Sequence, residues 1–427
     1  MSDFSFVVRC VLVQDDQGMA QCVLLSDAML DLKALHTHSQ RNLMPLSQAD
    51  IVKASRNRSL TLVSGSEEFY LLPTFVDLSL AGEGRLVVDA HGGTLGALRD
   101  TLHTSGHHVR HLEFAIPADK LRYDLPDAEQ DSQRITDSIR HFTTLRIKQR
   151  LDETLEIPPL SATADRIMQL RANPNATVNE LTSIVEADPS LAAQVVSWAS
   201  SPYYAAPGKI RSVQDAIVRV LGFDLVSNLA VGLILGRSVE LPKEAADGFT
   251  PYWLQAVYCS TAVEALARSM PVSKRPRQGM MYLAGLLHNF GYLVLAHTFP
   301  PHFSSICRYM EANPAISHVA IENHLIGISR EQISAWLMQA WNMPEEVCTA
   351  LRYQQDGSYT GPHDLYANLI YVAMRLLRHH GIGDAPPEPV EDAMYQKLGL
   401  DPARCEEAIQ KLVNSDDIRL IADQMTC

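Results

Sequence analysis

The chain has 427 residues, enough for two or three domains, and its 46% hydrophobic and 20% charged residues exclude a disordered chain. Its 36 Lys and Arg residues against 49 Asp and Glu give a formal charge of −13, so general binding to nucleic acid or to an anionic membrane is disfavoured. The seven cysteines are dispersed without a CxxC pair, which favours reduced thiols over a disulfide framework or a zinc ribbon.

The N-terminal residues MSDFSFVVRC lack the basic region and the small-residue cleavage site of a signal peptide. The most apolar stretches, at 229–236 and 282–287, are shorter than the roughly 18 residues that a membrane span needs. We therefore expect a cytoplasmic protein that makes no membrane contact.

The first 125 residues mix strand and helix signals, which indicates an α/β domain. Two short apolar runs at 6–14 and 20–26 flank the turn DDQG and predict a β-hairpin. Further strands are expected at 59–65, 69–73 and 84–90, and helices at 29–37 and 94–106.

Residues 126–157 predict a connecting helix. A polar stretch at 126–133 is followed by Ile135, Ile139 and Phe142 at helical spacing. The sequence IPPL then ends the helix, because proline lacks a backbone donor and turns the preceding residue away from the helical conformation.

From residue 158 to 427 the chain shows helix signals and hardly a strand, which predicts an all-α domain. Thr177 and Glu180 form a capping box, and Asp188 caps the following helix. Ser212 opens another helix, which stops at Gly222. Later helices are expected at 252–268, 279–296, 303–312, 315–325, 329–341, 344–354 and 363–380, with two short helices at the end.

The dipeptide His288–Asn289 in LAGLLHNFGYLVLAH is the main chemical signal of this domain. HD phosphohydrolases hold a metal with a His followed by an acid on a buried helix, whereas Asn keeps the shape of Asp without its charge. The alternative is a hydrogen-bonded core histidine near a helix turn at Gly291. The dipeptide taken alone favours this structural role.

Five segments of the all-α domain carry a family resemblance: 160–204, 212–230, 252–257, 286–291 and 327–355. Their DPSL, SPYY and W-x-x-P elements follow the order found in the HDOD family, the HD-related output domains of bacterial signalling, which they resemble. The resemblance covers about half the chain and implies an HD-like helical fold with its core at about 158–356.

The resemblance also implies where the metal positions of HD enzymes fall in this chain. They correspond to Gln255, His288, Asn289, Arg330, Gln354, Gln355 and Met374. Of these, His288 alone suits a metal, and Arg330 adds a positive charge where a metal ion needs a negative one. We therefore expect a vestigial HD pocket with no catalytic residue, no bound metal and no cofactor.

Two interpretations of Arg330 remain open. With Gln255, His288, Gln354 and Gln355 it could form a donor-rich pocket that binds a phosphate or a nucleotide. The interpretation that we favour is a solvated residue in the first turn of the helix at 329–341, where it makes a surface ion pair.

A second resemblance is carried by the N-terminal segments at 7–18, 29–35, 41–51, 71–77 and 86–92. Their order and spacing are similar to those of the YbaK-type aminoacyl-tRNA deacylases, in which a lysine at the end of the first strand helps to hold the acyl-tRNA ester. Here that place falls on Arg9 or Cys10. We therefore expect residues 1–125 to be a degenerate deacylase-type domain that serves in binding or packing.

Together these features predict a non-catalytic bacterial signal-transduction protein that acts through binding. The expected partners are an unidentified signalling protein, a small anionic ligand or nucleotide, and a second copy of the chain in a homodimer. Nucleic acid is not expected, except for tRNA at the N-terminal domain. Two enzymatic alternatives stay open: aminoacyl-tRNA deacylation in residues 1–125 and residual metal-dependent phosphohydrolysis around His288.

Overall fold

The computed structural model divides into two compact units, which are described separately. Unit 1 contains Met1–Asp124, Glu244–Gly248 and Pro301–Leu325, and unit 2 contains Leu125–Lys243, Phe249–Pro300 and Ile326–Cys427. The structure describes residues 5–57, 60–63, 69–81, 85–88, 91–121, 128–147, 161–204, 208–238, 242, 245–247, 249–386 and 388–426.

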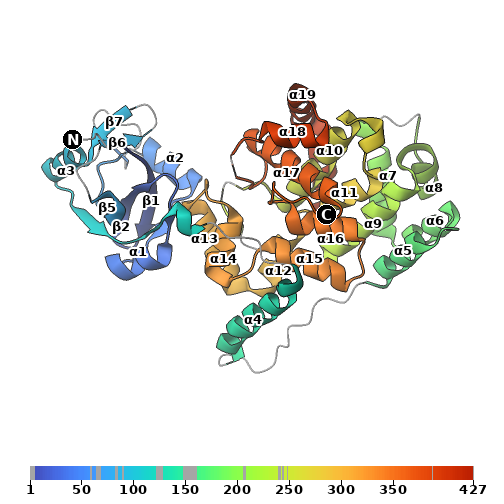
Figure 1. Cartoon of the computed structure of the whole chain (residues 1–427), viewed down its shortest axis with the longest axis horizontal. Helices are drawn as coiled ribbons and strands as arrows, with labels where there is room; N and C mark the ends of the chain where they lie inside the picture. The colour runs from blue at the N-terminus through green and yellow to red at the C-terminus, as the bar shows by residue number, and fades with distance from the viewer. Residues whose placement is uncertain are drawn as a thin grey trace. The chain divides into compact units, whose positions relative to one another are not determined.

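A mixed β-sheet forms the centre of unit 1, and Figure 1 shows it in blue with helices α1, α2 and α3 around it. Its strands run in the order β7-β6-β1-β2-β5-β8, and β4 pairs with β1. β1 is antiparallel to β2 but parallel to β6, and β5 is parallel to both β2 and β8. The fold therefore confirms an α/β N-terminal domain.

The elements of this domain have the following bounds: β1 Ser5–Asp15, β2 Gly18–Leu25, β3 Met29–Leu30, α1 Leu32–Ser39, β4 Met44–Pro45, α2 Gln48–Arg56, β5 Thr74–Asp77, β6 Arg85–Val88, β7 His91–Thr94, α3 Leu95–Thr104, β8 Val109–Leu112 and β9 Ala115–Ile116.

The predicted hairpin at 6–14 and 20–26 is confirmed by β1 and β2. Gly18 closes its turn with a φ of 110°, a conformation that L side chains rarely adopt. The strand predicted at 69–73 is wrong: Tyr70 makes only an isolated bridge with Leu62, and the chain enters the sheet at β5 instead. Every residue of β5 is buried.

Unit 1 also includes a helical hairpin from the second half of the chain. The hairpin consists of α13 (Pro300–Ala312) and α14 (His318–Ile326), helices that the sequence analysis grouped with the C-terminal domain. The Asn313 side chain, 1% exposed, accepts a hydrogen bond from the Leu30 backbone N–H and donates one to the Leu30 carbonyl. These contacts tie the end of α13 to β3.

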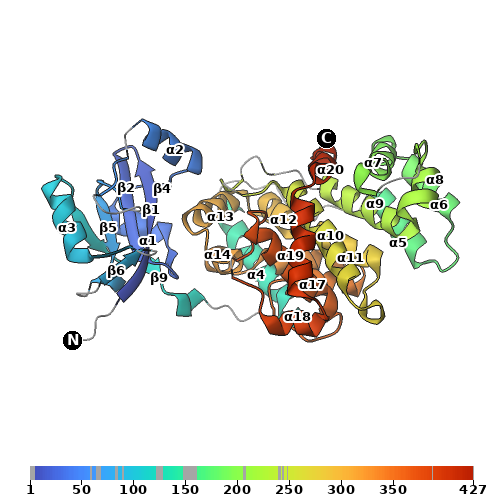
Figure 2. The same cartoon turned by 90° about the horizontal axis from the view of Figure 1, so that it is seen from above.

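The regular elements of unit 2 are all helices within its described residues, which confirms a helical C-terminal region. Figure 2 shows α10, α11, α17 and α19 side by side, and α10 packs against the other three. The elements are α4 Ala128–Ile147, α5 Ala162–Ala172, α6 Val178–Glu186, α7 Pro189–Ala199, α8 Val213–Ala216, α9 Phe223–Ser238, α10 Tyr252–Ser269, α11 Gln278–Leu287, α12 Phe290–Thr298, α15 Arg330–Ala340, α16 Glu345–Tyr353, α17 Asp364–His379, α18 Asp392–Leu398, α19 Pro402–Val413 and α20 Asp416–Thr426.

Local capping signals define several helix ends as predicted. The capping box of Thr177 and Glu180 starts α6, and the Asp188 side chain accepts two backbone N–H groups at the start of α7. Ser212 caps α8, and Gly222 follows the short π-helix after it with a φ of 81°. Two predictions are wrong: the helix expected at 279–296 is split into α11 and α12, and three helices rather than two end the chain.

The expected connecting helix is α4, which packs against α15 in unit 2. Its Asp131 is 5% exposed and binds the Arg352 guanidinium through both carboxylate oxygens. The same carboxylate accepts a hydrogen bond from Gln332 of α15 at 2.7 Å. α4 is thus fixed to this unit by a buried ion pair. Residues 148–157 of the expected connection lie outside the described part of the chain.

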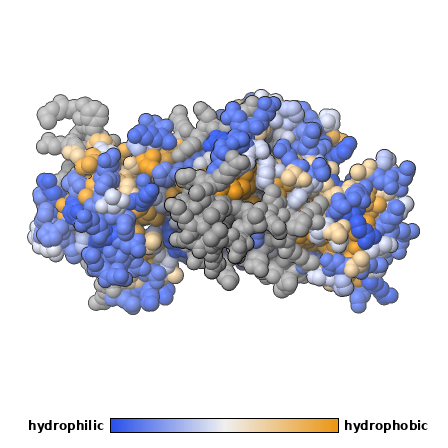
Figure 3. Space-filling view, turned by 90° about the horizontal axis from the view of Figure 1, so that it is seen from below, coloured by the Kyte–Doolittle hydropathy of each residue, from blue (hydrophilic) through white to orange (hydrophobic). Residues whose placement is uncertain are grey.

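Residues Gly279–His297 form one stretch that, by length and composition alone, could cross a membrane. This stretch is longer than the apolar run at 282–287 noted in the sequence. Within the structure 89% of it is buried, as in a core helix of a globular protein. The face drawn in Figure 3 is mostly hydrophilic, and outside its grey atoms the hydrophobic areas are small and separate.

Candidate functional site

The predicted pocket residues meet in unit 2, where α11 ends and α12 and α15 begin. Gln255 comes from α10 and Met374 from α17, while His288 and Asn289 occupy the break between α11 and α12. Gly291 makes the close approach feasible, because a Cβ there would lie 2.0 Å from the Arg330 carbonyl oxygen. The first turn of α12 therefore packs directly against the start of α15.

His288 is a buried, neutral histidine. Its Nδ1 donates to the Gly285 carbonyl oxygen at 2.8 Å, which leaves the lone pair of the neutral ring on Nε2. Burial lowers the pKa of His288 to about 4, so the ring is uncharged at neutral pH. The bond to Gly285 also matches the hydrogen-bonded core histidine that the sequence favoured.

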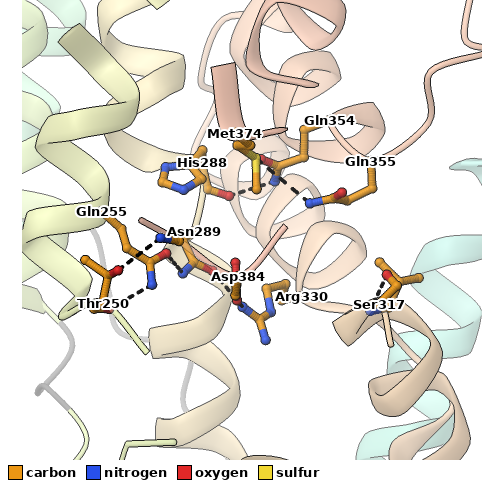
Figure 4. Close-up of polar contacts among 12 residues, drawn as sticks. Thr250, Gln255, His288, Asn289, Ser317, Arg330, Gln354, Gln355, Met374 and Asp384 are labelled. Carbon is orange, nitrogen blue, oxygen red and sulfur yellow. Dashed lines mark hydrogen bonds and ion pairs between the residues drawn. The ribbon is translucent and has the colours of Figure 1, made fainter. Parts of the chain in front are cut away.

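A chain of hydrogen bonds crosses the floor of this pocket, as Figure 4 shows. Gln255 donates to the Thr250 carbonyl oxygen at 2.7 Å and accepts from the Asn289 amide at 3.1 Å. The Asn289 oxygen accepts from Arg330 Nη1 at 3.0 Å, and the same nitrogen lies 2.5 Å from Asp384 Oδ2. The polar groups are thus satisfied by one another.

The favoured interpretation of Arg330 as a solvated residue is wrong. Arg330 is 2% exposed, and its side chain is buried together with Asp384, whose side chain is 3% exposed. The guanidinium also lies 5.2 Å from the centre of the Tyr292 ring. Its position at the first turn of a helix did not place it in solvent, because this helix is packed between α12 and α16.

Asp384 is a functional candidate that no pattern in the sequence indicates. It lies between α17 and α18 in an irregular segment, where no helical or strand period marks a residue as buried. Its carboxylate gives the pocket the negative charge that seemed absent, and Arg330 compensates that charge. The glycines and prolines of the surrounding sequence GIGDAPP are typical of a turn and do not indicate a buried carboxylate.

A small cavity lies beside His288. Its volume is about 10 Å³, close to the space that one water molecule needs. The cavity is lined by Gln255, Cys259, His288, Met374, Leu377, Ile382, Gly383, Asp384 and Ala385. Burial raises the pKa of the Cys259 thiol, so its sulfur is protonated at neutral pH. In this conformation the cavity is far smaller than the several hundred Å³ typical of a nucleotide site.

The two glutamines that follow α16 have different roles. Gln354, 1% exposed, donates to the His288 carbonyl oxygen at 2.7 Å and so supports the break between α11 and α12. Gln355 is half-buried and points its amide nitrogen at the Met374 sulfur, 3.9 Å away, which is a weak contact. All seven predicted positions therefore lie in one neighbourhood, and their role in binding stays a prediction.

These side chains do not fit a divalent metal ion. Among the described residues, no group of three or more His, Cys, Asp or Glu side chains is arranged to hold one. His288 offers one nitrogen and Asn289 a neutral amide, while the charge of Asp384 is already matched by Arg330. An arginine cannot give up its charge or donate a lone pair, so it opposes a metal at this place.

In unit 1, the candidate residues Arg9 and Cys10 point to opposite faces of β1. Arg9 donates to the Ala312 carbonyl oxygen at 2.8 Å and to Asn313 Oδ1 at 2.5 Å, so it binds the end of α13. Burial lowers the pKa of Arg9 to about 10, at which it is still cationic at neutral pH. Cys10 contacts Gln21 Oε1 at 3.4 Å on the other face. Arg9 therefore serves as an anchor in this structure.

Comparison with known proteins gives a family for the helical region. The HDOD domain family matches residues 157–357. A solved structure of a candidate signal transduction protein from Marinobacter aquaeolei VT8 is 42% identical, covers 99% of this chain and 94% of its own, and has a TM-score of 0.85.

Two more distant relatives match part of the chain. An HDOD domain protein of unknown function from Geobacter sulfurreducens is 21% identical with a TM-score of 0.53, covering 69% of this chain and 98% of its own. An uncharacterized protein of Treponema pallidum (strain Nichols) is 23% identical over 210 residues. That match spans 49% of this chain and only 39% of the Treponema protein. Residues 157–357 of this chain therefore form an HDOD domain, and over its full length the chain is similar to the Marinobacter protein.

Proposed function

We propose that this protein is a non-catalytic regulatory protein of bacterial signal transduction and that its HDOD domain acts by binding. The observation that carries the proposal is the buried Arg330 guanidinium, which binds Asn289 and Asp384 among the positions that the family resemblance assigns to the HD metal site. HDOD membership and the signal transduction assignment of the Marinobacter relative support a regulatory role.

The charge balance of the pocket is the physical reason for expecting no metal-dependent hydrolysis. A dication that bound Asp384 would take this carboxylate away from the buried Arg330 guanidinium. Breaking such a buried pair costs about 3–5 kcal/mol. His288 adds no charge to attract a metal, since its pKa of about 4 keeps it neutral. Together these residues favour a closed polar core over a metal centre.

For the N-terminal domain we propose a degenerate YbaK-like module that serves in packing or protein binding. Arg9, one of the two positions that correspond to the deacylase lysine, is turned toward α13 and bound there. A side chain held in this way is poorly placed to meet an acyl-tRNA ester. Deacylation of mischarged tRNA that depends on Arg9 or Cys10 would favour the enzymatic alternative.

The proposal is tested by the metal content of the purified chain. After dialysis against trace Mn²⁺, Fe²⁺ and Zn²⁺, mass spectrometry should find far less than one metal per chain, and phosphodiesterase turnover should not rise with added Mn²⁺. Stoichiometric metal that disappears in His288→Ala would overturn the proposal. His297→Ala is the matched control, because His297 is an exposed histidine on α12.

A further inference from the structure

The segment that follows α17 closes the cavity beside His288. We call residues 381–385 the strap; four of them, Ile382, Gly383, Asp384 and Ala385, line the cavity. We propose that Arg330 and Asn289 form a binding site for a small oxyanion, a carboxylate or a phosphate group, and that the strap fills this site with the carboxylate of Asp384. This inference rests on the proposed binding function and assigns a ligand class to it.

The cationic half of the site is built by residues outside the strap. Arg330 is held by the Asn289 oxygen at 3.0 Å and lies over the Tyr292 ring, so its guanidinium is fixed by α12 and α15. It points at Asp384 Oδ2, 2.5 Å away, inside the protein. When the strap leaves, the buried guanidinium loses its contact with the Asp384 carboxylate, and another oxyanion can take that place.

The strap itself has features of a movable segment. Gly381 and Gly383 have φ values of 75° and 86°, where glycine is favoured and the backbone can change direction with little steric cost. The Gly383 N–H donates to Thr250 Oγ1 at 3.0 Å, and its carbonyl accepts from Arg378 at 3.1 Å. The first of these hydrogen bonds is neutral and the second has one charged partner, whereas Arg330 and Asp384 form an ion pair in which both groups are charged and buried.

The size of the cavity couples binding to strap movement. The cavity of about 10 Å³ is lined by Asp384 but not by Arg330 or Asn289, and it is too small for acetate or phosphate. Because the Asp384 carboxylate occupies the place beside the Arg330 guanidinium, an oxyanion that binds Arg330 must displace it, which changes the surface presented by residues 381–385. A ligand that binds one conformation preferentially shifts the population toward it, which would give the domain a switch.

The test compares the full chain with its Asp384→Ala variant. Calorimetric titration with sodium acetate, and separately with inorganic phosphate, is run against chloride at equal ionic strength. Removing the competing carboxylate should lower the Kd for at least one oxyanion by about tenfold or more relative to the unchanged protein. Asp392→Ala, which removes an exposed carboxylate on α18, should behave like the unchanged protein.

The Arg330→Gln change in the Asp384→Ala background decides where the anion binds. The proposal is supported if Asp384→Ala binds the oxyanion and the double variant does not. It is overturned if the double variant still binds the oxyanion, or if Asp384→Ala does not bind it. A response to acetate alone assigns a carboxylate ligand, and a response to phosphate assigns a phosphate-bearing one. Metal content is a separate readout, so failure here leaves the proposed function standing.

A measurement on the unchanged protein covers the case in which Asp384→Ala does not fold. Hydrogen exchange of the strap amides, above all that of Gly383, is followed in acetate or phosphate and in chloride. Faster exchange in the oxyanion is expected, because displacement of Asp384 frees the strap from Thr250. Equal exchange rates in all three salts contradict the proposal.

Discussion

Single residues determine the character of the HDOD pocket. Arg330 supplies a fixed positive charge, Asp384 balances it, and Asn289 connects the pair to Gln255. His288 lies next to them without charge. These residues together form a polar core that contains an internal ion pair.

The buried state of His288 predicts a specific dependence of stability on pH. Its pKa in the folded state is about 4 against 6.5 for the exposed ring, so between these values only the unfolded chain takes up the proton. The stabilisation is therefore complete above pH 6.5 and is lost as the pH falls toward 4. From pH 7.5 to 5 the His288 contribution to the free energy of unfolding should fall by ~2 kcal/mol.

Urea unfolding of the unchanged protein and of His288→Gln at several pH values measures this contribution. The difference between the free energies of unfolding of the two proteins should decrease by ~2 kcal/mol from pH 7.5 to pH 5. Parallel curves for the two proteins would mean that His288 is solvated or charged in the folded chain.

The sequence predicted the residues of the pocket better than their environment. His288 was expected as a hydrogen-bonded core histidine, and the seven candidate positions do lie together. The burial of Arg330 and the role of Asp384 could not be predicted, because they depend on each other over 54 positions in sequence. An arginine in a first helical turn is usually solvated, and only a buried carboxylate from a distant loop reverses that expectation.

Among the helices, α4 shows how tertiary contacts fix the position of an element. The sequence indicated a helix that connects two domains, and within the described residues the helix is instead docked against α15. Asp131 binds Arg352 and Gln332, while Ser138 donates to the Ile326 carbonyl oxygen at 2.9 Å. These buried and half-buried hydrogen bonds hold the helix in unit 2.

Asp131→Ala should lower the free energy of unfolding by about 3–5 kcal/mol, because it leaves the buried Arg352 without its carboxylate. Urea denaturation measures the loss, and hydrogen exchange should show faster exchange in α4. Asp137→Ala removes a carboxylate that accepts from Gln133 on the exposed face of the same helix, and it should change stability by no more than about 0.5 kcal/mol. Equal effects of the two changes would contradict the assigned role of Asp131.

The sequence predicted the elements whose ends are marked by turn or capping residues. It did not predict the elements whose position depends on contacts between distant residues. The hairpin of β1 and β2 and the caps of α6, α7 and α8 follow from nearby residues. β5 has four residues and no alternation, since all of them are buried. The helix expected at 279–296 is interrupted because the His288 ring binds the Gly285 carbonyl oxygen, the acceptor that the Asn289 N–H would use in a continuous helix.

The whole molecule is assembled from a chain that passes between its two units several times. Residues 301–325 belong to unit 1 but lie between α12 and α15 of unit 2 in the sequence. Within unit 1, Asn313 binds both Arg9 and Leu30, and the Tyr309 hydroxyl donates to Asp31 Oδ1 at 2.6 Å. The sheet domain is therefore complete only with this hairpin.

A fragment of residues 1–124 alone should consequently be less stable than the same fragment with residues 299–327 added in trans. Without the hairpin, the Leu30 N–H and the Arg9 guanidinium lose buried partners, each at a cost of about 1–3 kcal/mol. Thermal unfolding of the fragment, with and without the peptide, measures the difference. An Asn313→Ala peptide is the matched control and should stabilise less. Equal stability in all three samples would show that the hairpin is dispensable.

The interleaved connection has a consequence for synthesis on the ribosome. Residue 325 emerges about 200 residues after residue 124, which at about 5–20 residues per second is a delay of roughly 10–40 s. During this interval the sheet has been made, but Arg9 and Leu30 await the segment that satisfies them. The nascent N-terminal domain thus stays incomplete while most of the second unit is translated, and the surface that the hairpin later covers is exposed during that time.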